Sequence, residues 1–200
     1  MPATNWWSSE DFWRKFAIWV TGLMFVVLIF LTFHSVSQIQ AGTDRVPSYS
    51  VINQRIFYEF DSEQKRMVPV IGKEAPLFGK KLNDAEAEAL VTRGKLTIQS
   101  KNCINCHTLL GNGAYYAPDL TKAWLDPAWV SEGAREQLMV GFLMDPANNA
   151  RMFGSGRKMP NLDITEDEAK AIVAFLKWMS AINTNGFPHN FKTIEQGGQS

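Results

Sequence analysis

An unbroken apolar run near the amino terminus constrains this chain more than any other feature. Residues 16–33 read FAIWVTGLMFVVLIFLTF and carry no charged side chain. Because an α-helix rises 1.5 Å per residue, this run nearly spans the hydrocarbon core of a bilayer, and Phe12 and Trp13 lengthen it. The alternative is a cleaved signal peptide, whose apolar region is usually shorter and ends at a site of small residues, which residues 34–38 do not resemble. The run therefore predicts a retained transmembrane anchor.

The flanks of the run predict the orientation of the anchor. Arg14 and Lys15 lie directly before it, and short basic flanks stay on the cytoplasmic side of a membrane. We therefore expect residues 1–40 to form a cytoplasmic stub and a single-pass anchor, with the rest of the chain on the outer side. His34, at the outer end, is expected to be an interfacial or helix-packing residue rather than a metal ligand. Aromatic residues suited to the inner interface are Trp6, Trp7, Trp13 and Trp19.

The two cysteines of the chain lie in one short motif. Cys103, Cys106 and His107 spell C-x-x-C-H, the signature of covalent c-type haem attachment. Two thiols at this spacing can form thioethers to the vinyl groups of one haem, and the histidine supplies the proximal iron ligand. A zinc site is the main chemical alternative, but it needs four ligands, and only His34 and His189 remain. A thioredoxin-like redox pair, the other alternative, expects a βαβ context that the sequence lacks.

A methionine is the expected ligand on the other side of the iron, because electron-transfer haems commonly use Met or His there. Met159 lies in the loop FGSGRKMP of residues 153–160, just before a strong helix start. The glycines let the backbone approach the haem closely, and Pro160 stiffens the position of the ligand. Met152 is the second candidate, because the remaining methionines lie in the anchor, in the segment before the motif or at helical spacing that favours core packing.

Residues after the motif are expected to support the histidine. A ligating histidine normally donates its second N–H to a carbonyl or a carboxylate. The carbonyl of Pro118 is the candidate acceptor, and Leu120 is expected to pack on the haem ring; a simple turn proline is the alternative interpretation. Charges expected near the haem edge, with solvated surface as the more common alternative, are Lys101, Lys122, Arg157 and Lys158.

Helix signals surround the motif. Capping boxes at Asn83 and Thr165, each with a glutamate three residues further on, begin a first and a last helix. A middle helix is expected over residues 126–144, with Pro127 near its first turn. Gly94 removes a side chain from the first helix, so a large side chain of the last helix could cross there, with Phe175 and Trp178 as candidates.

The order of these elements resembles the class I cytochrome c fold, and the resemblance covers residues 83–182. Before it, residues 41–82 predict a short β-hairpin: apolar residues alternate partly with polar ones over residues 51–60, a turn follows, and residues 67–71 return. An irregular linker is the alternative for this segment. The predicted fold is thus an all-α class I cytochrome c domain with one N-terminal transmembrane helix and a short β-hairpin insertion, followed by a C-terminal tail over residues 183–200.

Longer stretches carry a resemblance to one family. CHTLLGNGAYYAPDL at residues 106–120, Met159-Pro160, FLKWMSAINTN at residues 175–185 and LTFH at residues 31–34 are similar to the small, membrane-anchored monohaem cytochrome c subunit of bacterial nitric oxide reductase. The resemblance implies a bacterial inner-membrane protein with its haem domain in the periplasm. It also implies one covalent haem c as the redox centre, and an electron relay that performs no catalysis on its own.

The resemblance further implies the partners of the chain. A soluble periplasmic cytochrome c or cupredoxin would donate electrons. A large membrane subunit with a haem b and a haem b₃–non-haem iron centre would accept them and reduce two nitric oxide molecules to nitrous oxide and water. In the family a calcium ion lies near the interface of the two subunits, and the matching residues here are Gly113 and Tyr115. An ordinary turn is the alternative interpretation of those two residues.

Two other functions stay open at this point. The chain could be an anchored monohaem cytochrome that serves a haem–copper oxidase or another periplasmic reductase. It could also be a gas-binding sensor haem if Met159 is not a ligand. The charges are balanced, with 20 basic and 20 acidic side chains, so the composition does not argue for a nucleic-acid partner. Membrane lipid around the anchor is the remaining expected partner.

Overall fold

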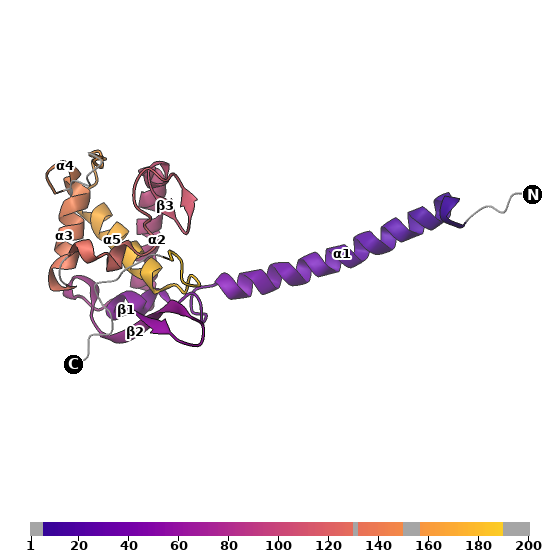
Figure 1. Ribbon diagram of the computed structural model, residues 1–200, viewed down its shortest axis with the longest axis horizontal. Helices are drawn as coiled ribbons and strands as arrows, with labels where there is room; N and C mark the ends of the chain where they lie inside the picture. Colours follow the sequence, from indigo (N-terminus) through magenta and orange to yellow (C-terminus); the bar gives the residue numbers. More distant parts are fainter. Residues whose placement is uncertain (1–5, 130–131, 150–156, 190–200) are drawn as a thin grey trace, which may run out of the picture.

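The computed structural model describes residues 6–129, 132–149 and 157–189, and it consists of one long helix and a domain at its end (Figure 1). Helix α1 spans Glu10–Ile39 and follows a 3₁₀ turn at Trp6–Ser8. Ser9 caps the helix, because its hydroxyl accepts a hydrogen bond from the Phe12 N–H at 3.2 Å. The helix extends several residues beyond the apolar run at both ends, where polar side chains take over.

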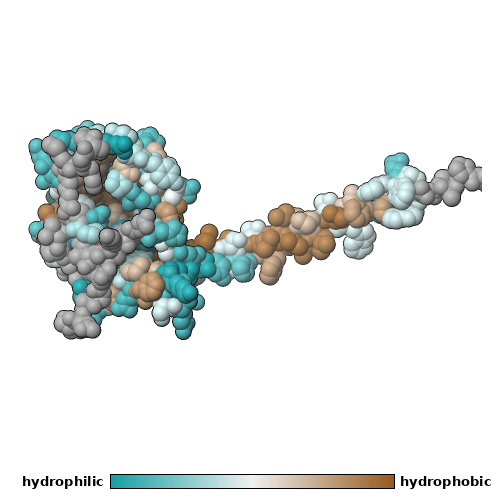
Figure 2. Space-filling model, in the orientation of Figure 1, coloured by the Kyte–Doolittle hydropathy of each residue, from teal (hydrophilic) through white to brown (hydrophobic). Residues whose placement is uncertain are grey.

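Helix α1 is long and apolar enough to cross a membrane, and among the described residues it is the one helix that meets this test. Hydrophobic side chains gather along its middle, and more polar ones occupy its ends (Figure 2). None of its residues is buried against the domain. The anchor expected near the amino terminus therefore exists as a continuous helix with an unpartnered apolar surface.

The segment between α1 and the domain forms hydrogen bonds and a ring contact with the end of the last helix. The Asn183 N–H donates to the Arg45 carbonyl at 2.9 Å, and the indole N–H of Trp178 donates to the Pro47 carbonyl at 3.1 Å. Tyr49 then packs on the Trp178 ring, with 5.2 Å between the ring centroids. The first residues after the anchor are thus fastened to the end of the last helix.

The predicted β-hairpin is confirmed. Strands β1 (Gln54–Asp61) and β2 (Arg66–Glu74) pair antiparallel, and Asp61 closes the turn by accepting hydrogen bonds from two backbone N–H groups. Ile56 and Tyr58 point from β1 into the core. Val51 was expected to share the strand pattern, but it lies in a 3₁₀ turn over Tyr49–Asn53, where it is buried.

Helices α2 (Asp84–Ser100) and α5 (Glu166–Ala181) begin at the two predicted capping boxes, both of which are complete. They cross at Gly94, where an added Cβ would overlap the carbonyl of Ala171 and would lie 2.8 Å from the Phe175 Cβ. The predicted crossing at Gly94 is therefore confirmed with Phe175. Trp178 instead packs against the segment that follows the anchor.

The middle helix begins later than expected. Helix α3 spans Glu132–Met144 and is followed by the short helix α4 (Pro146–Asn149). Residues Pro127–Trp129 form a separate 3₁₀ turn, closed by a hydrogen bond from the Trp129 N–H to the Asp126 carbonyl at 3.1 Å. The expected start at Asp126-Pro127 is wrong because the proline opens this turn and not α3. Other short elements are 3₁₀ turns at Leu77–Gly79, Cys103–Asn105 and Ala123–Leu125, and the strand pair β3 (Thr108–Leu109) and β4 (Asn112–Gly113).

Candidate haem-binding site

A cavity of about 990 Å³ opens between the turns that follow α2 and the segment that precedes α5. This volume is at the upper end of the usual range for sites that hold a small molecule or a cofactor. The four predicted haem ligands all line the cavity, and so do the two predicted supporting residues: Cys103, Cys106, His107, Met159, Pro118 and Leu120. Residues that lie far apart in the sequence thus meet around one space.

The two thiols come from a tight turn. The chain leaves α2 through Asn102, whose left-handed backbone (φ 54°) reverses its direction. A 3₁₀ turn over Cys103–Asn105 follows, and the His107 N–H donates to the Cys103 carbonyl at 2.9 Å. This winding directs both cysteines to the cavity as free thiols. Burial raises the pKa of the Cys103 thiol, so this thiol is neutral at ordinary pH.

His107 is held by the loop that follows it. Its Nδ1 lies 2.7 Å from the carbonyl oxygen of Pro118, so Nδ1 carries the proton and donates the hydrogen bond. Backbone bonds from Ala117 N–H to Cys106 carbonyl and from Leu120 N–H to Thr108 carbonyl, both 2.8 Å, fix this loop. The ring therefore has one nitrogen, Nε2, left with a lone pair for a metal.

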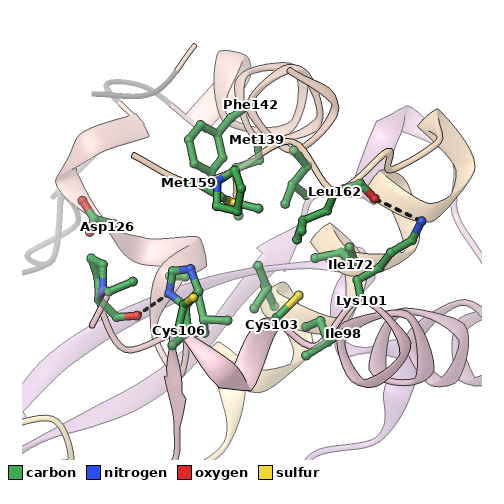
Figure 3. A pocket seen from close by; sticks show the side chains of 18 of the residues that line it. Ile98, Lys101, Cys103, Cys106, Asp126, Met139, Phe142, Met159, Leu162 and Ile172 are labelled. Atoms are coloured by element: carbon green, nitrogen blue, oxygen red, sulfur yellow. Dashed lines mark hydrogen bonds between the residues drawn. The ribbon is translucent and has the colours of Figure 1, made fainter. Parts of the chain in front are cut away.

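Met159 lies across the cavity from the two cysteines, on a wall that it shares with Met139 and Phe142 of α3 (Figure 3). The cysteines come from the turn after α2, so the wall that carries the thioether and the wall that carries the thiols belong to different parts of the chain. A planar ring bound by the thiols would have space between them. Met152, the second candidate, and the glycines of the loop lie outside the described residues.

Two cations fasten the segment that carries Met159. The Arg157 guanidinium donates to the Tyr116 carbonyl at 2.8 Å and lies over the Tyr116 ring, 4.9 Å from its centroid. The Lys101 ammonium donates to the carbonyls of Leu162 and Asp163, at 3.3 and 3.0 Å. The positions of Lys101 and Arg157 at the cavity agree with their expected place near its edge, and Lys158 also lines it.

Lys122 contradicts the expectation that it lies near the haem edge. Its side chain is buried, with 2% of its surface exposed, and it does not line the cavity. Its ammonium group donates to the carbonyls of Ser180 and Ile182 at 3.2 and 2.8 Å, and lies 4.6 Å from the centroid of the Tyr58 ring. Burial lowers the pKa of Lys122 to about 7, although Asp119 acts in the opposite direction.

The residues suggested for calcium have other roles in the described structure. Gly113 has a φ of 124°, and a Cβ there would overlap the carbonyl of His107, so the close packing of β4 on the haem motif requires a glycine. Tyr115 is 81% exposed, and its hydroxyl donates to the Gly111 carbonyl at 3.2 Å. These contacts account for the backbone conformation of Gly113 and for the hydrogen bond of the Tyr115 hydroxyl.

The donor set fits a covalently bound haem c. Two free thiols, one oriented imidazole and one thioether line a cavity whose surface is mostly apolar. The zinc alternative has less support, because the described residues contain no group of three or more His, Cys, Asp or Glu side chains placed so that they could hold a metal ion. The thioredoxin-like alternative lacks its structural context, since the motif follows α2 and not a strand of a βαβ unit.

Several residues of the site were not predicted. Met139 was interpreted as core packing, and Phe142, three residues further along α3, was not singled out. Helical spacing does not distinguish a core from a cavity wall. The contact between Arg157 and Tyr116 joins residues 41 positions apart, so no local signal could have revealed it. The Thr108 hydroxyl donates to the Asp119 carboxylate at 2.6 Å and stiffens the loop behind His107. This contact also joins residues that are not neighbours in the sequence.

Comparisons with known proteins agree with this site. The model of the family described as Cytochrome c matches residues 91–180. The nitric oxide reductase C subunit of Stutzerimonas stutzeri is 36% identical over 114 residues, which cover 56% of this chain and 74% of the relative. Its counterparts in Paracoccus denitrificans and Cereibacter sphaeroides are each 34% identical, over 120 and 100 residues, and 73% and 67% of their lengths are covered. The domain is therefore a cytochrome c domain, mostly helical, with a small two-stranded sheet.

Proposed function

Since this chain belongs to the family of nitric oxide reductase C subunits, we propose that it is the electron-transfer component of such a reductase and carries one covalent haem c. The observation that supports this most directly is the meeting of two free thiols, an oriented imidazole and a thioether at one cavity. A bound haem would supply one-electron chemistry at its iron. The rest of the function depends on what the surrounding residues do.

We assign each residue of the site one task. Cys103 and Cys106 form the thioethers, and His107, held by the Pro118 carbonyl, ligates the iron from the proximal side. Met159 ligates from the distal side, and Leu120 packs on the ring. If His107 and Met159 both held the iron, no position would remain for a substrate, and the chain alone would be a relay and not a catalyst. Met139 and Phe142 exclude water from the methionine side.

The proposed architecture follows the sequence boundaries. Residues 1–40 form the cytoplasmic stub and anchor, residues 41–82 the hairpin segment, residues 83–182 a haem domain of the class I cytochrome c type, and residues 183–200 the tail. The basic side chains of Arg14 and Lys15 support an orientation with the haem domain in the periplasm of a bacterial inner membrane. The exposed apolar surface of α1 supports a place among lipids and partner helices.

The proposed partners are a donor and an acceptor. A soluble periplasmic cytochrome c or cupredoxin delivers electrons to the haem c. A large membrane subunit with haem b and a haem b₃–non-haem iron centre takes them and reduces two nitric oxide molecules to nitrous oxide and water. We include a calcium ion at the interface of the two subunits, held by oxygen atoms of Gly113 and Tyr115. The exposure of Tyr115 supports access from a partner, and oxygen atoms are the ligands that Ca²⁺ prefers.

The test is to purify the chain from membranes under mild extraction, with its partners, and to record redox spectra together with nitric oxide consumption. We expect haem c together with haem b, and nitric oxide turnover. Met159→Ala should slow electron entry at least about tenfold, because loss of the thioether lowers the haem potential. Met144→Ala is the matched control, since Met144 is exposed and does not line the cavity.

Other outcomes would overturn the proposal in distinct ways. Haem c without haem b and without nitric oxide turnover would favour an anchored monohaem cytochrome for a haem–copper oxidase or another reductase. Carbon monoxide binding to the ferrous wild-type chain would mean that Met159 leaves the iron open, which favours a gas sensor. Absence of covalent haem would remove the basis of the site itself.

A further inference from the structure

Lys122 is a buried cation whose hydrogen-bond partners are neutral. Its ammonium group donates to the carbonyls of Ser180 and Ile182, which end helix α5, and its third direction faces the Tyr58 ring. Within the described part of the chain, no carboxylate forms an ion pair with it, and Asp119 acts on it as a more distant charge. A lysine taken out of water in this way loses its proton more easily than an exposed one.

The position of this charge relative to the cavity is defined by its neighbours. Leu120 and Ala123, on either side of Lys122 in the sequence, line the cavity, whereas Lys122 points the other way. Leu176 of α5 lines the cavity as well, and Ser180 lies four residues, or about 6 Å, further along the axis. The ammonium group therefore lies in the buried core, next to the helical turn that follows the cavity-lining part of α5.

We propose that Lys122 tunes the haem potential by binding a proton when the iron is reduced and releasing it when the iron is oxidised. This inference rests on the proposed function, because it needs a haem in the cavity. The oxidised iron carries one positive charge more than the reduced iron, and like charges repel more strongly in a protein interior than in water. If a bound haem were reduced by one electron from the donor, the neutral amine of Lys122 would take one proton from the solvent, and it would return that proton on oxidation.

The groups that face Lys122 set the pH range of this exchange. Tyr58, from β1, donates to the same two carbonyls, and burial raises its pKa, so it stays neutral throughout. Asp119, from the loop of Lys122 itself, favours the charged lysine. Lys177 lies about one turn before these carbonyls on α5, and its ammonium donates to the Ala75 carbonyl at 2.9 Å and lies over the Trp124 ring. Because burial lowers the pKa of Lys122 to about 7, the exchange falls near neutral pH.

The experiment is a spectroelectrochemical titration of the full haem-bearing chain from about pH 5 to about pH 9, a range that brackets the pKa of Lys122. We expect the wild-type potential to be high at low pH, to fall through neutral pH and to level off above it. A proton affinity about three to ten times higher in the ferrous chain is expected for a charge at this depth. A tenfold ratio corresponds to about 59 mV between the two plateaus.

Two substitutions should give reduction potentials equal to the two plateaus of the wild-type profile. Lys122→Arg keeps the charge at every pH, so its potential should be independent of pH near neutrality and equal to the acid plateau. Lys122→Met removes the charge, so its potential should be equally flat and equal to the alkaline plateau. A role confined to packing would shift both variants without flattening either profile. His189→Gln, which removes an exposed titratable group, should leave the wild-type profile unchanged.

The outcomes separate this inference from the proposed function. A wild-type slope that persists in either Lys122 variant would assign the proton to another group, such as a haem propionate, and would overturn the inference. If Lys122→Met does not fold, as judged by its haem content, the profile of Lys122→Arg decides alone. A haem-bearing wild type with a flat profile also overturns the inference but leaves the electron-transfer function intact. A chain that attaches no haem refutes the proposed function instead.

Discussion

The crossing of α2 with α5 and the cavity beside it are built from the same two helices in opposite ways. At the crossing, protein packs on protein: Gly94 lies against the backbone of Ala171 with no space for a methyl group. At the cavity, Ile98, Ile172 and Leu176 of the same helices face a space of about 990 Å³. One face of the helix pair is thus complete without a cofactor, and the other depends on one.

This difference implies a gradient of stability across the domain. The crossing has two capped helices and a continuous core, whereas the cavity wall that carries the haem motif consists of turns, with the two-residue strands β3 and β4 beside them. Regions with few buried apolar contacts open locally before the whole domain unfolds. We infer that the helix pair is the scaffold, and that the cofactor completes the part of the core that the turns leave open.

The largest effect should follow from filling the crossing. Gly94→Val places side-chain atoms where the carbonyl of Ala171 lies, and backbone cannot move aside as a flexible side chain can. We expect a loss of at least about 4 kcal/mol in the free energy of unfolding, measured by denaturant titration of the full chain in detergent. Gly133→Ala is the control, since a Cβ at Gly133 meets nothing within 4 Å. It should change stability by less than about 1 kcal/mol. A loss below about 1 kcal/mol in Gly94→Val would mean that the helices can separate at little cost.

A smaller and more local effect should follow from loss of the cofactor. Cys103→Ser with Cys106→Ser prevents covalent attachment, and amide hydrogen exchange then reports on both regions in one experiment. We expect residues 102–123 to lose about a hundredfold in protection, which is about 2.7 kcal/mol of local opening. Protection at the α2–α5 crossing should change by less than about threefold. Equal losses in both regions would show that the domain opens as one unit and would contradict the gradient.

The features that the sequence predicted are those set by neighbouring residues, and several of the features that it missed depend on contacts between distant segments. Both capping boxes, the apolar helix and the hairpin are local signals, and the structure contains all of them. Lys122 was expected near the haem edge, with solvated surface as the alternative, and nothing in the neighbouring sequence reveals the carbonyls that receive it at the end of α5. The late start of α3 was missed because a proline can open a 3₁₀ turn as readily as a helix.

The smallest expected effects come from the two helix caps, and they distinguish the two regions most finely. Asn83→Ala and Thr165→Ala each remove one N-cap hydrogen bond and should each cost about 1 kcal/mol in the free energy of unfolding. Their local consequences should differ. Glu86, the partner of Asn83, lies 3.6 Å from the ammonium of Lys80, which does not line the cavity. Glu168, the partner of Thr165, lies 3.5 Å from the Lys101 ammonium, which does.

Because that ammonium holds the carbonyls of Leu162 and Asp163, a loosened α5 cap should also loosen the segment that follows Met159. We therefore expect Thr165→Ala to raise hydrogen exchange at residues 161–163 by several-fold and Asn83→Ala to leave it unchanged. The comparison needs no activity measurement, and both variants keep every residue that lines the cavity. Equal exchange in the two variants would show that the cavity wall does not depend on the α5 cap, and the scaffold would then act through the helix crossing alone.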